Sequence, residues 1–209
     1  IAILAGMLLP AMAKAKEANM PSDNVKNAIK RGTGEIPGVI YETINYEAYG
    51  PGGVAIMIQT LTDNKNRTTA EVRNILSKKG GNMAGAGSVA WMFNMKGYIV
   101  VDKSAAAEDV LMDAALEAGA EDIKTQEKVY EVFSVPADFE KVKQAMQEKG
   151  INFQSAEVTM IPTSAVKVVG SEAKQVLGLV EALEEQDDVQ EVYANFDIPD
   201  EVIEQIAAE

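Results

Sequence analysis

The chain has 209 residues, 47% of them hydrophobic and 24% charged, an ordinary composition for a globular protein with one large or two small domains. It contains neither cysteine nor histidine, which excludes disulfides, thiolate chemistry, Ser-His-Asp triads and the common zinc sites. The formal net charge of −13 argues against strong non-specific binding of duplex DNA by the chain as a whole.

The chain begins with IAILAGMLLPAMAKAKE, in which residues 1–13 carry no charge. This run is too short to span a bilayer alone, so we interpret it as a helix packed on the body; a truncated membrane anchor is the alternative. It resembles the hydrophobic helix of type IV prepilin-like proteins. Pro21, Ser22 and Asp23 then predict the start of a helix that ends near Gly32. We expect residues 1–37 to form a small helical segment.

Residues 41–49 alternate loosely and predict a strand, and Gly50-Pro-Gly-Gly predicts the turn after it. Residues 54–61 are almost entirely apolar and predict a strand buried on both faces. Thr68 and Glu71 have the spacing of a capping box, which predicts a helix that begins there and ends at the next glycine pair.

The region after this helix predicts a further strand over residues 88–93. Its alternation places Trp91 on the same side as Val89 and Phe93, which indicates a core position in preference to a surface on which bases stack. Lys96-Gly97 predicts a turn that leads into a new strand.

The elements that follow have the order βαββαβ, which is the ferredoxin-like arrangement. They are strand 98–101, helix 104–118, strand 121–126, strand 129–134, helix 137–149 and strand 153–160. The exposed positions of this unit are acidic, so it offers a docking surface for a basic partner.

The last part of the chain predicts strand 165–169, helix 171–186 and strand 189–194. These elements lack partners of their own, while residues 41–93 supply strands and only one helix of a two-layer sandwich. We therefore expect the fold class to be α+β, with two α/β-sandwich domains. The domains and the terminal pieces are assigned as follows: helical segment 1–37, discontinuous domain 38–95 plus 163–199, inserted ferredoxin-like domain 96–162 and tail 200–209.

The strongest candidate for an anion site is the loop Asn64-Lys65-Asn66-Arg67, which offers amide and cationic donors beside a helix N-terminus. Its alternative is a surface loop whose polar residues only cap and turn. Residues 1–98 carry 11 basic and 7 acidic side chains, and residues 99–209 carry 8 and 25, so the first half is the one suited to an anion. Other cations that would extend the site are Lys26, Lys30, Arg31, Arg73, Lys78 and Lys79.

Acidic residues elsewhere in the chain do not indicate a metal or catalytic site. The acidic run 184–188 lacks the ligand spacing of a calcium loop and is interpreted as a solvated helix end. No carboxylate pair suits hydrolysis, so we expect no catalytic residue, metal, cofactor or small-molecule substrate.

Several long segments resemble the YebC family of transcriptional and translational regulators, over about residues 18–209. These segments are NMPSDNVKNAIKRGTGE, YEAYGPGGVA, LTDNKNRTTAEVR, GSVAWMF with a following KG, AEVTMIP and DDVQEVYANFDIP. Family members usually also carry a basic N-terminal segment of the GHSKWANIK type, which this sequence lacks; weaker nucleic-acid binding is expected from that difference.

The resemblance implies a non-enzymatic, cytoplasmic regulatory protein that is directed to nucleic acid. It implies a DNA-binding transcriptional regulator, a ribosome-associated translation factor that contacts rRNA or tRNA, or both. The alternative from the charge pattern is a protein–protein adaptor whose acidic domain docks a basic partner. A membrane partner is not expected.

Overall fold

The computed structural model describes residue 30, residues 40–199 and residues 201–202. The hydrophobic start of the chain and most of the predicted segments 1–37 and 200–209 therefore lie outside the described residues. Within the described residues, no helix is long and apolar enough to cross a membrane.

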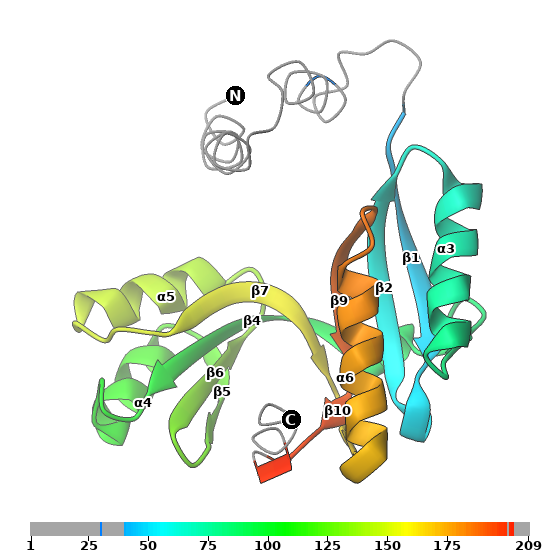
Figure 1. The fold of residues 1–209 in the computed structure, drawn as a ribbon. Helices are drawn as coiled ribbons and strands as arrows, with labels where there is room; N and C mark the ends of the chain where they lie inside the picture. The colour runs from blue at the N-terminus through cyan, green and yellow to red at the C-terminus, as the bar shows by residue number, and fades with distance from the viewer. Residues whose placement is uncertain (1–29, 31–39, 200, 203–209) are drawn as a thin grey trace, which may run out of the picture.

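A four-stranded antiparallel sheet forms the first half of the structure (Figure 1). Its strand order is β3-β1-β2-β9, so a strand from near the C-terminus pairs with β2. The tight turn between β1 and β2 holds Gly52 and Gly53 at φ of 68° and 78°, which glycine adopts without strain. The elements of this half are β1 (Glu42–Tyr49), η1 (Pro51–Gly53), β2 (Ala55–Thr62), α3 (Lys65–Lys78), β3 (Asn82–Met83), η2 (Ala90–Met92), α6 (Gly170–Glu184) and β9 (Val189–Ala194).

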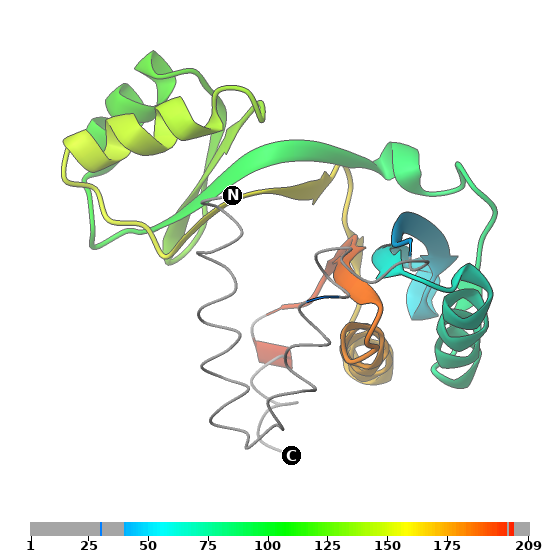
Figure 2. The ribbon, with the colours of Figure 1, turned by 90° about the horizontal axis from the view of Figure 1, so that it is seen from above.

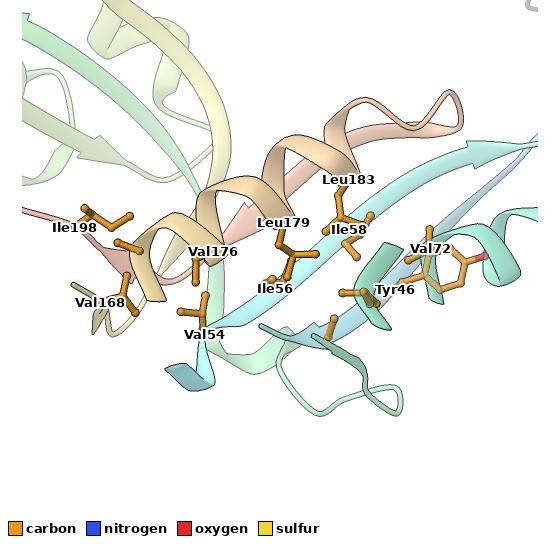
Figure 3. Packing of buried hydrophobic residues seen from close by; sticks show 13 residues of the cluster. Tyr46, Val54, Ile56, Ile58, Val72, Val168, Val176, Leu179, Leu183 and Ile198 are labelled. Atoms are coloured by element: carbon orange, nitrogen blue, oxygen red, sulfur yellow. The ribbon is translucent and has the colours of Figure 1, made fainter. Parts of the chain in front are cut away.

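Helices α3 and α6 both cover one face of this sheet, and their apolar side chains form its main core (Figure 3). Ile56 and Ile58 of β2 are fully buried beneath Val72 of α3 and Leu179 of α6. β2 is buried on both faces along most of its length, as its apolar sequence predicted. A short parallel pair, β8 (Val166–Lys167) with β10 (Phe196–Asp197), lies beside this half.

The second half has the predicted βαββαβ order and a second antiparallel sheet with strand order β5-β6-β4-β7. The two central strands are the first and third of the unit, as in a ferredoxin-like fold, which confirms the α+β class. Its core joins the sheet to α4 and α5. The elements are β4 (Phe93–Asp102), α4 (Glu108–Glu117), β5 (Ala120–Thr125), β6 (Val129–Ser134), α5 (Phe139–Glu148) and β7 (Ser155–Pro162).

The two halves meet where the long strands β4 and β7 reach the face of the first sheet that the helices leave uncovered (Figures 1 and 2). A small apolar cluster fills this junction. Its members are Ala55, Met57, Val89, Met92, Phe93, Met160 and Tyr193. The exact division of the chain into domains stays a prediction.

Four local predictions were wrong, three of them between residues 64 and 93. α3 begins at Lys65 after Asn64, and Thr68 lies inside the helix, so the proposed loop is largely helical. Residues 90–92 form a 3-10 helix, because the Val89 and Ala90 amides donate to Glu47 and are not available to a strand. Trp91 consequently points outward, with 69% of its surface exposed, although Val89 and Phe93 are buried as expected.

Lys96-Gly97 is likewise no turn, since β4 runs without interruption through both residues. The glycine is explained by packing: a methyl carbon at Gly97 would lie 2.7 Å from a ring carbon of Phe139 on α5. The glycine therefore allows α5 to approach the sheet closely.

Candidate functional site

The predicted anion loop at the start of α3 is mostly occupied by its own hydrogen bonds. The Asn64 side chain accepts from the Arg67 amide at 3.2 Å and caps the helix. The Arg67 guanidinium donates to Asp188 at 2.8 Å and to Asp63 at 3.2 Å. Two of the four predicted donors are thus committed to the fold, whereas Lys65 and Asn66 are exposed.

Asp188 is the centre of this network, and the sequence did not indicate it. It belongs to the acidic run interpreted as a solvated helix end, but its residue is only 9% exposed. Thr68 donates to it at 2.6 Å and Thr62 at 3.3 Å, in addition to Arg67. Burial opposes ionisation, but the bonds from Arg67 and Thr68 outweigh it and lower the pKa of Asp188.

Replacing Asn64 by alanine is expected to lower the free energy of unfolding by about 1 kcal/mol, because the amide of Arg67 loses its cap. Urea denaturation followed by circular dichroism measures this difference. Asn66→Ala is the matched control, since Asn66 is the exposed next asparagine on the same helix. An equal effect of the two substitutions would contradict the capping role.

A cationic groove of about 480 Å³ lies between the end of α3 and the first turns of α6. Among the residues that the structure describes, its lining is cationic, polar or glycine. The Lys79 ammonium lies over α6 at a glycine, since a methyl carbon at Gly178 would come 3.9 Å from Nζ. The residues that line it, here called the lysine groove, are Lys78, Lys79, Gly80, Lys174, Gln175 and Gly178.

The structure brings only some of the predicted cations together. Lys78 and Lys79 share the lysine groove, whereas Lys65 begins the same helix and lies about 20 Å away, at 1.5 Å per residue. Arg73 contacts the Met83 sulfur at 3.8 Å. Lys30 is exposed, and Lys26 and Arg31 lie outside the described residues. Sequence reasoning missed Lys174, because it is separated by almost 100 residues from the lysines that it joins.

The glycine-rich segment between α3 and β4 is attached to β1 by a buried carboxylate. Glu47 accepts from the amides of Gly87 and Val89, each at 2.6 Å, and of Ala90 at 2.9 Å. Burial alone would raise the pKa of Glu47, but these amide bonds outweigh it and the pKa is lowered. The three hydrogen bonds to Glu47 therefore hold residues 87–90 against β1.

Comparisons with known proteins agree with this architecture. A "Probable transcriptional regulatory protein" of Halothermothrix orenii is 53% identical over 202 residues, which cover 95% of this chain and 80% of that protein. Another of the same name, from Dictyoglomus turgidum, is 53% identical over 201 residues, covering 96% and 81%. The crystal structure of a conserved hypothetical protein from Aquifex aeolicus matches with a TM-score of 0.69 and 44% identity, covering 92% of this chain and 80% of that one.

The family model described as "TACO1/YebC second and third domain" matches residues 41–196, which span both sheets and the junction between them. This match extends over well more than half of the chain. The chain therefore belongs to the TACO1/YebC family.

Proposed function

We propose that this chain is a non-enzymatic regulatory protein that binds nucleic acid through the lysine groove. The observation that carries the proposal is the convergence of Lys78, Lys79 and Lys174 in a chain whose net charge is −13. The lysines gather around one groove, and such a concentration of positive charge in an acidic chain attracts a polyanion.

The chemistry of the groove suits a phosphate backbone. Each lysine supplies a flexible point charge that neutralises a phosphate without base specificity. Gly80 and Gly178 carry no side chains, so a strand can approach the helix backbone closely. The groove supplies positioning and salt-dependent affinity, and it does not by itself read sequence.

The names of the relatives support a regulatory role, since they are called probable transcriptional regulatory proteins. Both targets implied by the family resemblance, duplex DNA and ribosomal RNA or tRNA, present such a backbone. The proposal includes both targets and a cytoplasmic location, and the binding experiment decides between the targets.

A second candidate is a protein–protein adaptor, favoured by the charge of residues 96–162. This range contains 13 acidic and 7 basic residues, so its surface suits a basic protein such as a ribosomal protein. Such docking would not depend on the lysine groove, and this difference separates the two candidates.

Replacing Lys78, Lys79 and Lys174 together by glutamine is expected to weaken binding to ribosomes or to duplex DNA at least tenfold at low salt. Three lost phosphate contacts should also reduce the slope of log K against log salt by about 2 to 3. Fluorescence anisotropy with labelled DNA, and co-sedimentation with purified ribosomes, each over a salt series, measure these effects.

The matched control replaces three exposed lysines of the acidic domain, Lys128, Lys141 and Lys149, by glutamine and changes the net charge equally. Equal losses from the two triple variants would mean that net charge matters and the groove does not. Ribosome binding that resists the groove variant, falls with added salt and is lost when acidic residues within residues 96–162 are neutralised would favour the adaptor.

A further inference from the structure

Two exposed aromatic side chains contact the glycine-rich segment at Ser88. Trp91, the only tryptophan in the sequence, is 69% exposed, and Tyr49 at the end of β1 is 40% exposed. Among the described residues these are the only aromatic side chains that are exposed, and an exposed apolar group that is clustered is a candidate contact surface.

The two rings are fixed to one backbone atom. The Trp91 indole Nε1 donates to the Ser88 carbonyl oxygen at 3.0 Å, and the Tyr49 hydroxyl donates to the same oxygen at 3.2 Å. The donor atoms therefore lie within about 6 Å of each other. Glu47 holds the backbone on both sides of Ser88 through the amides of Gly87 and Val89. Rings held in this way lose little conformational entropy when a ligand binds.

The Trp91 N–H and the Tyr49 hydroxyl already donate to the Ser88 carbonyl, so a ligand would contact the π faces of the two rings. Every nucleobase has a complementary face, and stacking on aromatic side chains is the usual way in which proteins bind unpaired bases. A duplex does not offer such a face, because its bases are stacked on each other.

The charge around the pair also favours a nucleic acid. Residues 72–101 contain no acidic residue, although the chain has 32, and they include Arg73, Lys78 and Lys79; the fourth cation of this range, Lys96, is paired with Glu121. The carboxylate that the segment does contact, Glu47, is buried and occupied by three amides. A basic protein partner would find no acidic group in this segment.

The pair is connected to the lysine groove through the short loop after α3. Gly80 and Gly81 lie against the start of the β1–β2 turn, since methyl carbons there would meet Pro51 at 3.7 Å and the Tyr49 carbonyl at 3.1 Å. Tyr49 is also opposite Asn82 in the pairing of β1 with β3. A strand whose phosphates occupy the groove can therefore place a following base near the rings.

We propose, building on the function above, that Trp91 and Tyr49 form a stacking platform for an unpaired base of single-stranded nucleic acid whose backbone lies in the lysine groove. The geometry assigns positioning of the phosphates to the lysines and contact with the base to the rings.

Because the chain has a single tryptophan, its fluorescence reports on residue 91 alone. A decamer of uridylate is expected to quench this emission on binding, whereas an abasic decamer with the same phosphates should bind about tenfold more weakly and leave it unchanged. A deoxyuridylate decamer compares DNA with RNA as the source of the base. Acrylamide should strongly quench the Trp91 fluorescence of the free protein. Weak quenching would show that another part of the chain covers the Trp91 ring, and it would overturn the proposal.

Anisotropy of labelled decamers tests the residues. Trp91→Ala should weaken uridylate binding about tenfold without affecting the abasic decamer, Trp91→Phe should retain most of the affinity, and Tyr49→Phe, which keeps the ring, should lose little. Leu116→Ala, an exposed apolar position in the other half, is the control.

Different results would contradict nucleic-acid binding through the lysine groove and base stacking on the two rings. If the wild-type chain binds no nucleic acid, or binds equally well without the groove lysines, the proposed function fails. If binding needs the lysines but neither Trp91→Ala nor removal of the bases changes it, only the stacking platform is overturned.

Discussion

Replacing Asp188 by alanine is expected to lower the free energy of unfolding by about 3 to 4 kcal/mol. The substitution removes the buried carboxylate that accepts from the Thr62 and Thr68 hydroxyls, of which Thr68 keeps the Asn64 carbonyl at 3.1 Å, and it removes the closest partner of Arg67. The Arg67 side chain is 44% exposed, so water partly compensates for the loss of its ion pair with Asp188. Equilibrium unfolding in urea at pH 7 measures the change.

Asp187→Ala is the matched control, because it removes the same charge from the exposed neighbouring position. It should change stability by less than about 0.5 kcal/mol. Asp188→Asn keeps the shape and should lie between the two. If Asp187→Ala were as harmful as Asp188→Ala, loss of local charge, and not the hydrogen-bond network, would explain the effect.

Replacing Glu47 by glutamine is expected to lower the free energy of unfolding by about 3 kcal/mol at pH 7. A carboxylate accepts all three amides of Gly87, Val89 and Ala90, whereas the glutamine NH₂ group faces at least one of them as a second donor. Glu42→Gln, an exposed position on the same strand, is the control and should be nearly neutral.

The loss should depend on pH in a defined direction. The pKa of Glu47 is lowered by folding, so its ionised form stabilises the native state above the ordinary pKa of about 4.5. This contribution disappears as the pH falls through the lower, folded pKa. The difference between wild type and Glu47→Gln should therefore be largest at pH 6–7 and shrink below pH 4; a constant difference down to pH 3 would contradict the role of the charge.

Much of the fold was accessible from the sequence because its periodicity is regular. The apolar run of β2, the glycines that follow α4 and α5, and Pro136 before α5 mark their elements independently of tertiary contacts. These are local or compositional signals. In the structure α6 packs in the same core as α3, and β9 joins the sheet of β1 and β2.

The site was predicted less well, because its decisive contacts join distant residues. Nothing near Arg67 in the sequence shows that Asp188 occupies its guanidinium, and nothing near Trp91 shows that Glu47 takes the adjacent amides. The alternation of apolar residues predicted a buried Trp91 only if residues 88–93 form a strand, and residues 90–92 form a 3-10 helix. Lys174 joins Lys79 solely through the packing of α6 against α3.

The pairing of β2 with β9 has a consequence for synthesis of the protein. Ile56 is opposite Ala194, so β2 must wait for almost 140 further residues before its second neighbour exists. At 5–20 residues per second, a ribosome needs on the order of ten seconds for this distance. The ferredoxin-like unit, which is complete at Pro162, can fold in that interval while an apolar strand of the first sheet is still uncovered on one edge. Chaperone dependence and aggregation during translation should therefore concentrate on residues 55–62.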